Sequence, residues 1–285
     1  MQPENHPASR PEGESGGLLA AFRAEKEKEI AALIRQEQEG RFPAPLCAVR
    51  PSFRAALTAP HGGILPVIAE YKRASPSRGN IRIDLSPEDV AGRYAAAGAT
   101  CLSVLTEGSR FKGELGFLPR MASAGLPLLR KDFILDSLQV RATAATPASA
   151  LLLIVRLTPD ARILRELREE AERFGMDVVV EIFNSEDLAL ARESGARIIQ
   201  VNARDLDTLR MDRDACLSMG AARRDGELWI AASGMSEQEH LRRAAEAGFD
   251  AVLIGSGLMA DTDPGAALAR LTGKKVVKQT GEADA

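Results

Sequence analysis

Charged and amide side chains stand where short apolar runs of this chain end. Glu70 and Lys72 close the first run and, being two residues apart in an extended segment, point to the same side. Lys131 follows the third run, Glu181 closes the fifth and Asn202 closes the sixth. One such residue alone could simply mark where a strand reaches water, but a carboxylate ending an apolar strand is costly without a partner. Two lysines, two glutamates and an asparagine on one rim therefore favour acid–base chemistry on a small molecule.

Small residues end the last two apolar runs. Ser233-Gly234 closes the seventh run, and Gly255-Ser256-Gly257 closes the eighth. Small side chains let backbone N–H groups approach an anion, and a helix that starts there adds its positive end. These two segments predict a phosphate site, although glycines at such places can equally be ordinary turn residues.

The elements that must position these residues alternate regularly. Apolar runs that indicate strands cover 65–71, 100–106, 127–129, 150–155, 177–182, 197–202, 228–233 and 251–255. Amphipathic segments that indicate helices cover 87–97, 115–124, 137–145, 159–174, 185–194, 213–222, 236–247 and 264–271. Strict alternation favours a parallel sheet, and eight repeats in about 210 residues favour a closed (β/α)8 TIM barrel. In that fold the active site lies at the carboxyl ends of the strands, where the charged residues fall.

Helix boundaries are marked by capping residues and glycines. Ser86-Pro87, Thr158-Pro159 and Asp263-Pro264 each predict a cap followed by proline at the first helical position. Glycines stand where three helices should stop, at Gly98, Gly195 and Gly248. A dinucleotide-binding fold would instead show G-x-G-x-x-G after the first strand, where this chain has Ala-Ser-Pro-Ser at 74–77.

The segments outside the repeats are expected to be one helix and two tails. Leu18–Gly40 has the pattern of an extra amphipathic helix. Either this helix caps the bottom of the barrel, or the segment after it, 42–57, helps to close the top. Residues 1–17 have the composition of a disordered tail, and 273–285 lack a sustained apolar pattern. The barrel domain is therefore expected to span 18–272.

Composition excludes several classes of function. The net charge of −3 gives no electrostatic reason to expect nucleic acid or an anionic membrane as a partner. No run is long and apolar enough for a membrane span or a secretory signal, and three scattered cysteines fit a reducing cytosol. With only three histidines, none after a strand-like run, a histidine-bound metal or a Ser-His-Asp triad is poorly supported. We expect a cytoplasmic enzyme, monomeric by default, that needs no metal.

Several motifs resemble those of the indole-3-glycerol-phosphate synthase family. The most specific are Ile-Ala-Glu-Tyr-Lys-Arg-Ala-Ser-Pro-Ser at 68–77 and Leu-Arg-Lys-Asp-Phe-Ile at 129–134. Further matches are the segments 102–107, 180–181, 202–206 and 254–259, and the resemblance runs from about residue 18 to 271. It implies an enzyme of tryptophan biosynthesis without a cofactor. Its substrate would be the phosphorylated small molecule 1-(2-carboxyphenylamino)-1-deoxyribulose 5-phosphate, and its products indole-3-glycerol phosphate, carbon dioxide and water.

The resemblance also implies roles for the site residues. Lys131 matches the general acid that acts on the ribulose carbonyl, and Lys72 matches a second lysine that could take that role instead. Glu181 matches a catalytic carboxylate that could act in dehydration. Glu70 and Asn202 match residues that orient the substrate and the lysines. A lysine beside another cation in a desolvated barrel mouth is expected to have a lowered pKa.

The remaining matches concern binding. Ligand and phosphate positions correspond to Ser75, Ser233, Gly234, Gly255 and Ser256, and Phe111 corresponds to the aromatic residue that packs on the substrate ring. Arg204 could pair with the substrate carboxylate or with Glu181, or form a structural ion pair.

Three positions depart from the family pattern. The seventh strand, usually Ser-Glu-Ser-Gly, reads Ala-Ala-Ser-Gly at 231–234, so Ala232 replaces a glutamate near the substrate hydroxyls. Ala203 interrupts the usual Asn-Asn-Arg, and the turn 146–149 reads Thr-Pro-Ala-Ser in place of Ala-Gly-Ala-Asp. That turn lies on the face opposite the site, where it should affect packing.

Two alternatives remain open. Another phosphate-binding barrel would need a cysteine base where Glu70 and Lys72 stand, a Schiff-base lysine where Asn202 stands, or histidine metal ligands. A non-catalytic barrel that binds a phosphorylated ligand or a partner protein would explain the loss of the glutamate at Ala232.

Overall fold

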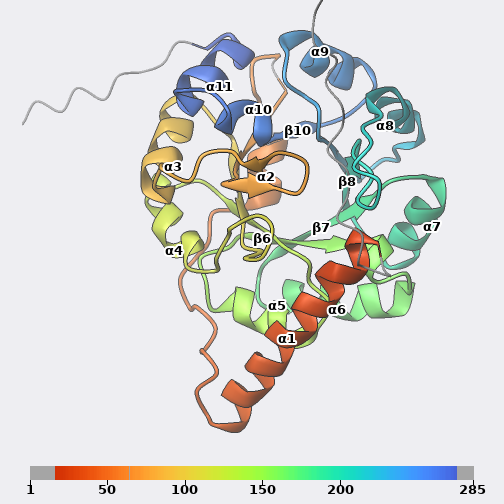
Figure 1. Ribbon diagram of the computed structural model, residues 1–285. Helices are drawn as coiled ribbons and strands as arrows, with labels where there is room; N and C mark the ends of the chain where they lie inside the picture. The colour runs from red at the N-terminus through yellow and green to blue at the C-terminus, as the bar shows by residue number, and fades with distance from the viewer. Residues whose placement is uncertain (1–16, 64, 275–285) are drawn as a thin grey trace, which may run out of the picture.

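Eight parallel strands close into a barrel in the computed structural model, which describes residues 17–63 and 65–274 (Figure 1). In order around the barrel they are β1 (Val67–Tyr71), β4 (Cys101–Leu105), β5 (Leu128–Lys131), β6 (Ala150–Ile154), β7 (Asp177–Ile182), β8 (Ile198–Asn202), β9 (Leu228–Ala232) and β10 (Ala251–Ile254), which pairs with β1. Each lies within about two residues of an apolar run noted above, so the predicted (β/α)8 barrel is confirmed.

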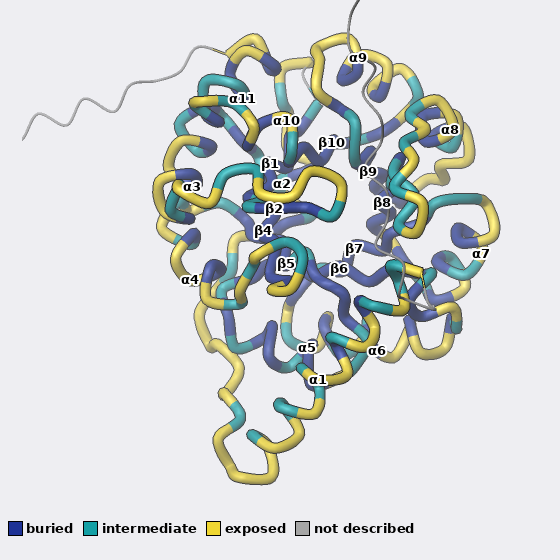
Figure 2. Tube along the Cα trace, in the orientation of Figure 1, coloured by how far each residue is buried: buried dark blue, intermediate teal, exposed yellow. Residues whose placement is uncertain are grey.

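A ring of helices surrounds the barrel, one after each strand. They are α3 (Pro87–Ala96), α4 (Phe117–Met121), α5 (Ser137–Ala144), α6 (Ala161–Arg173), α7 (Ser185–Glu193), α8 (Arg213–Ser218), α9 (Gln238–Glu246) and α11 (Pro264–Thr272). The short elements are β2 (Ala74–Ser75), β3 (Gly79–Asn80), α10 (Ser256–Met259) and the 3-10 turns η1 (Ala122–Ala124), η2 (Val155–Leu157) and η3 (Met219–Ala222). Figure 2 shows buried strands at the centre and exposed outer faces on the helices, the pattern expected of a sheet covered on all sides.

Capping behaves as predicted at two of the three helices that begin near proline. The Ser86 and Asp263 side chains accept backbone N–H groups at the starts of α3 and α11, with proline in the first turn. The prediction at Thr158 is wrong, because α6 begins two residues later with Asp160 as its cap. The Asp160 carboxylate accepts two backbone N–H groups, and its charge also suits a helix N-terminus.

Side chains inside the barrel change character from bottom to top. On β1 the inward residues run from Ile68 to Glu70, and on β7 from Val179 to Glu181; all four are at most 1% exposed. Because side chains alternate along a strand, β1 and β7 fill the lower barrel with apolar residues and present their last inward residue at the carboxyl end. The apolar lower layers thus form a rigid floor under the polar upper layer.

The N-terminal segment covers both ends of the barrel. Leu18 and Phe22, in the first turns of α1 (Leu18–Gln38), line the cavity at the carboxyl ends of the strands, and α1 then runs past the rim (Figure 1). The following helix, α2 (Phe53–Thr58), lies at the opposite end, where the Arg54 backbone N–H donates to the Asp177 carboxylate at the start of β7 (3.0 Å). The helix itself was predicted, but both suggested placements are wrong. The reason is that Phe53, a fully buried apolar residue, fits the apolar bottom of the barrel.

The two predicted tails fall largely outside the described residues, in 1–16 and 275–285. In the part of the chain that is described, no helix combines the length and apolarity that crossing a membrane requires.

Candidate active site

Two lysine–glutamate pairs form the centre of the site. Lys72 Nζ lies 2.5 Å from Glu70 Oε1, and Lys131 Nζ lies 3.5 Å from Glu181 Oε2. Both carboxylates are almost fully buried, whereas the lysine side chains are 18% and 17% exposed. The ammonium groups therefore face the cavity while the carboxylates hold them from beneath. The predicted convergence of these four residues on one rim is confirmed by this geometry.

The pKa of Lys131 is raised, not lowered as the sequence suggested. Burial alone would lower it, but the negative charges of Glu181 and Glu70 outweigh burial. The prediction gave weight to a neighbouring cation, whereas the carboxylates are the groups that dominate around this amine. Lys131 is consequently protonated at neutral pH, which is the form that a general acid needs, although the raised pKa also makes it a weaker acid.

A glycine is needed at position 255 for a reason other than the approach of an anion. A Cβ atom at this position would lie 2.1 Å from Glu70 Oε1, so only glycine leaves room for that carboxylate. The Ser103 hydroxyl donates to the other oxygen, Glu70 Oε2, at 3.3 Å. Strands β10 and β4 thus fix the Glu70 side chain from both neighbours of β1.

Three phenylalanines form an aromatic wall on one side of the cavity. The Phe22 ring stacks on Phe133, with centroids 4.0 Å apart, and lies 6.0 Å from Phe111. Lys72 Nζ lies 5.9 Å from the centre of the Phe111 ring. Phe111 was predicted, whereas Phe22 and Phe133 were not. Their signal was present, because Phe133 follows the Lys-Asp pair after β5 and Phe22 stands on the apolar face of the first helix.

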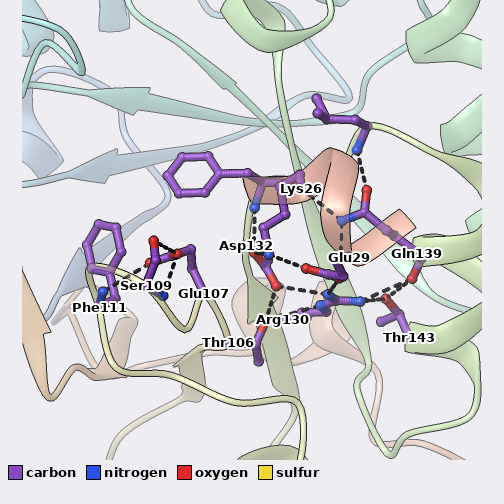
Figure 3. Close-up of polar contacts among 12 residues, drawn as sticks. Lys26, Glu29, Thr106, Glu107, Ser109, Phe111, Arg130, Asp132, Gln139 and Thr143 are labelled. Carbon is purple, nitrogen blue, oxygen red and sulfur yellow. Dashed lines mark hydrogen bonds and ion pairs between the residues drawn. The ribbon is translucent and has the colours of Figure 1, made fainter. Parts of the chain in front are cut away.

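The loop that carries Phe111 is fastened by one buried carboxylate. Glu107 accepts the backbone N–H groups of Ser109, Arg110 and Phe111 at 2.7, 2.9 and 3.0 Å (Figure 3). A Cβ atom on Gly113 would lie 2.3 Å from the carbonyl oxygen of residue 105, so the loop must return to the barrel at a glycine. The Phe111 ring is therefore held in place on the wall of the cavity.

A buried ionic network ties α1 to the strand that carries Lys131. Lys26 Nζ lies 2.6 Å from Asp132 Oδ1, and Arg130 lies 2.8 Å from Asp132 and 3.2 Å from Glu29. Figure 3 shows these side chains meeting between α1 and the end of β5. The pKa of Asp132 is held well below its ordinary value, because Arg130 and Lys26 outweigh the opposing effect of burial. Helix α1 is thus an integral part of the site.

The groups described above line one cavity. It opens to solvent and has an accessible volume of about 80 Å³. Its lining includes most of the predicted residues: Glu70, Lys72, Ser75, Phe111, Lys131, Glu181, Asn202, Arg204, Ser233 and Ser256. The other two, Gly234 and Gly255, line an adjoining hollow that shares Glu70, Lys72, Arg204, Ser233 and Ser256 with the first. The structure therefore brings together all twelve predicted site residues.

The adjoining hollow is rich in arginine. Arg78, Arg204 and Arg213 line it together with the residues after β9 and β10. Ser233 and Gly234 have φ angles of +69° and +74°, so the chain turns sharply there. Three guanidinium groups beside small residues suit a phosphate group. Arg78 and Arg213 were missed from the sequence, because each lies in a loop or at a helix start with no strand-end position to mark it.

Asn202 and Arg204 are held by contacts within their own segment. Asn202 Oδ1 accepts the backbone N–H of Arg204, and the Arg204 guanidinium donates to the carbonyl oxygen of Leu209, both at 3.0 Å. Burial, assisted by the charge of Arg78, lowers the pKa of Arg204. The suggested pairing of Arg204 with Glu181 is therefore not observed. The suggested pairing with the substrate carboxylate stays a prediction.

The departures from the family pattern lie in two different places. Ala232 is buried, faces the barrel interior and is the register partner of Asn202. The turn at 146–149 lies at the other end, where the Ser149 N–H bonds to the carbonyl oxygen of Leu128 at the start of β5. Of the three departures only Ala232 faces the barrel interior, since Ala203 packs in the other apolar cluster, with Val201. The place of the turn agrees with the expectation that it affects packing.

Comparison with known proteins gives a consistent family assignment. Residues 19–271 match the family model described as indole-3-glycerol phosphate synthase. A protein of that name from Chlorobium phaeovibrioides is 39% identical over 248 residues, covering 86% of this chain and 95% of the relative. One from Mycolicibacterium vanbaalenii is 42% identical over 237 residues, covering 83% and 84%. Among solved structures, 3-hexulose-6-phosphate synthase from Salmonella typhimurium has a TM-score of 0.59 at 15% identity, covering 73% and 97%, which supports the fold.

Proposed function

Because this chain belongs to the indole-3-glycerol phosphate synthase family, we propose that its cavity closes the indole ring of 1-(2-carboxyphenylamino)-1-deoxyribulose 5-phosphate. The family places the enzyme among the decarboxylating lyases of tryptophan biosynthesis. The products are indole-3-glycerol phosphate, carbon dioxide and water. The observation that carries the proposal is the Lys131–Glu181 pair, a cation and a buried carboxylate that line the same cavity.

The substrate fits the two hollows in one orientation. Its aromatic ring packs against the wall formed by Phe22, Phe111 and Phe133, and its phosphate enters the arginine-lined hollow. The carboxylate on the ring then lies within the influence of Lys72 or Arg204, which line both hollows. Holding a flexible chain at both ends brings the reacting carbons together, and orientation of this kind supplies much of the rate.

Ring closure needs an acid above the ribulose carbonyl. The ring carbon that bears the carboxylate attacks the carbonyl carbon, while Lys131 gives its proton to the carbonyl oxygen, which becomes a hydroxyl. The ionised carboxylate then leaves the ring as carbon dioxide, and the electrons of the broken carbon–carbon bond restore the aromatic ring. Lys131 regains a proton from solvent and gives it to the hydroxyl, which leaves as water, while Glu181 takes the proton lost from the neighbouring carbon as the indole forms. A protonated lysine beside a buried carboxylate supplies the acid and the base that these two steps need.

The direct test compares wild type with Lys131→Met by the fluorescence of the indole product. We expect kcat to fall by about 10²-fold or more while KM changes little, since acid–base groups contribute about 10²–10⁴-fold. Lys28→Met, which removes an exposed lysine 72% accessible to solvent, is the matched control and should retain full activity. Undiminished turnover in Lys131→Met would exclude this lysine as the acid.

The two lysines can be separated by the same assay. Lys72 borders both hollows and lies against Phe111, so we propose that it binds the substrate while Lys131 donates the proton. Lys72→Met should then raise KM more than it lowers kcat. The opposite pattern, a kcat effect at Lys72 and a KM effect at Lys131, would exchange the two roles.

Ala232 supports one alternative function, a barrel that binds the phosphorylated ligand without turning it over. Wild-type protein that binds a substrate analogue tightly yet forms no product would favour that alternative. Ala232→Glu is the variant to examine next in that case, because it restores the carboxylate that is usual in the family.

We further propose that the protein acts in the cytosol as a monomer, without a nucleic-acid or membrane partner. The net charge of −3 supports the absence of such partners. The cysteines support a reducing compartment, because Cys47, Cys101 and Cys216 are all free thiols. Analytical ultracentrifugation at micromolar concentration tests the monomer, and a sedimenting mass of twice 30.5 kDa would contradict it.

A further inference from the structure

A polar side chain lies unexpectedly within the apolar layer below the cavity floor. Gln200 on β8 is fully buried and faces the barrel interior between Ile198 and Asn202. Its register partner on β9 is the apolar Ile230, and its register partner on β7 is Glu181. Burying an amide in such a layer is unfavourable unless its hydrogen bonds are made.

Gln200 makes only one of the hydrogen bonds that would justify its burial. Its Nε2 donates to Glu181 Oε2, but its Oε1 accepts from no group in the described part of the chain. A methionine of similar shape would avoid this unsatisfied oxygen. Stability of the barrel therefore does not account for a glutamine here, whereas the bond to Glu181 does.

The two oxygens of Glu181 have different surroundings. Oε2 receives the Gln200 amide and lies 3.5 Å from Lys131 Nζ. Oε1 is equally buried and has no hydrogen-bond partner among the described residues. One oxygen is thus fixed by the protein, and the other is left to accept a proton or a hydroxyl from a ligand.

A neutral donor at this place has a specific effect. An arginine or lysine would neutralise the carboxylate, and an apolar residue would leave it with Lys131 alone. The amide stabilises the charged form of Glu181 through a hydrogen bond and leaves its negative charge intact. It also stops rotation of the carboxylate, because the donor end of Gln200 must face it to avoid repulsion between oxygens.

We propose that Gln200 is a positioning residue for the reaction, which keeps Glu181 charged by fixing its Oε2 and leaves Oε1 as the oxygen that accepts the reacting proton. The proposal rests on the proposed function, in which Glu181 is the base of the dehydration step. Gln200 acts through Glu181 and does not touch the substrate.

The test is the pH dependence of turnover in Gln200→Met, with Ile230→Leu as the matched control in the same layer. A hydrogen bond to a charged group is strong enough for its loss to shift a protonation equilibrium by about 10–100-fold. We therefore expect the acid limb of the kcat profile to move up by about one to two pH units in Gln200→Met. At neutral pH kcat falls, and KM stays within about twofold because the substrate contacts are unchanged. The control should keep the wild-type profile.

A second readout does not depend on turnover. In protein labelled with ¹³C at glutamate carboxyl groups, the Glu181 resonance is identified by its loss in Glu181→Gln, and its titration midpoint is followed by NMR. The midpoint should move up by one to two pH units in Gln200→Met and stay in place in Ile230→Leu. An unmoved midpoint would overturn the inference even if the wild type is active. An inactive wild type with a shifted midpoint would instead refute the proposed function and leave the role of Gln200 toward Glu181 intact.

Discussion

Replacing Lys26 by methionine tests whether α1 is bound to the barrel by its buried charges. The substitution keeps an unbranched side chain of similar length and removes only the ammonium group. That group lies 2.6 Å from Asp132 and 2.5 Å from Glu29, and the Lys26 side chain is only 4% exposed. The aromatic ring of Phe22, one helical turn earlier, keeps its stack on Phe133. The effect should therefore be electrostatic.

The magnitude follows from what remains around Asp132. Breaking a buried ion pair by removing one partner costs about 3–5 kcal/mol when the other charge is left uncompensated. Here Arg130 still lies 2.8 Å from Asp132, and the Phe133 backbone N–H donates to the Asp132 carboxylate at 2.8 Å. The Asp132 charge therefore keeps one cation and one hydrogen-bond donor. We expect the lower end of that range, about 3 kcal/mol. For a domain of this size that corresponds to a fall in Tm of about 6–12 °C.

Calorimetry of Lys26→Met and Lys28→Met gives the comparison directly. Lys28 is two residues away on the same helix and pairs with Glu25 at 2.7 Å, but its side chain is 72% exposed. An exposed pair of this kind contributes about 0–1 kcal/mol, so its loss should shift Tm by no more than a few degrees. Equal Tm values for the two variants would refute the claim that burial makes Lys26 important.

The same variant should change how stability depends on pH. The pKa of Asp132 in the folded protein lies below its ordinary value of 3.8, so its stabilising effect is present above that value. The effect is lost as the pH falls through the folded pKa. Without Lys26 the folded pKa of Asp132 rises toward 3.8, and acid unfolding of Lys26→Met should begin at higher pH than in wild type. Circular dichroism from pH 7 to pH 2 measures this, and superimposable acid transitions would contradict it.

Two further predictions concern single contacts. Gly255→Ala places a Cβ 2.1 Å from Glu70 Oε1 and should lower kcat/KM by about 10²-fold by displacing that carboxylate. The control Gly92→Ala, at an exposed position of α3 with no atom near the added Cβ, should be nearly neutral in the same assay, and equal losses would argue against steric displacement. Burial would raise the pKa of Glu227, but Arg192 outweighs burial and holds the pKa at about 2, below its ordinary 4.5. Glu227→Gln should therefore lower Tm at pH 7. The Tm difference between this variant and wild type should shrink as the pH falls toward 2. A Tm difference that stays constant with pH would contradict this account.

The sequence predicted most of the fold because its signals are local. Apolar runs such as 177–182 mark strands that are covered on both faces, and Ser86-Pro87 and Asp263-Pro264 fix helix starts by their own side chains. The residues of the site were predictable for a related reason. In a parallel barrel all strands have their carboxyl ends on the same face, where the active site lies. The last inward residue of each strand therefore faces the site, even when the other site residues are far away in the sequence.

What the sequence did not predict depends on contacts between distant segments. The placement of α1 and α2 is determined by Lys26 meeting Asp132 and by Arg54 meeting Asp177, and no local pattern encodes either meeting. The raised pKa of Lys131 likewise follows from the distance to Glu181 on another strand. Arg78 does not stand at the end of a barrel strand, so its position in the sequence gave no reason to expect it near a phosphate.

The N-terminal segment also has a consequence for the order in which the protein assembles. Glu29 is separated from Arg130 by 101 residues, and Arg54 from Asp177 by 123, so both elements are synthesised well before the strands that they contact. Contacts between such distant residues carry a loop-closure cost that must be met before they can form. Until β5 and β7 exist, the apolar face of α1 and the Phe53 side chain stay exposed on the nascent chain. The aromatic wall needs Phe22 beside Phe133, so the cavity can acquire it only after β5 and the residues that follow it have been synthesised.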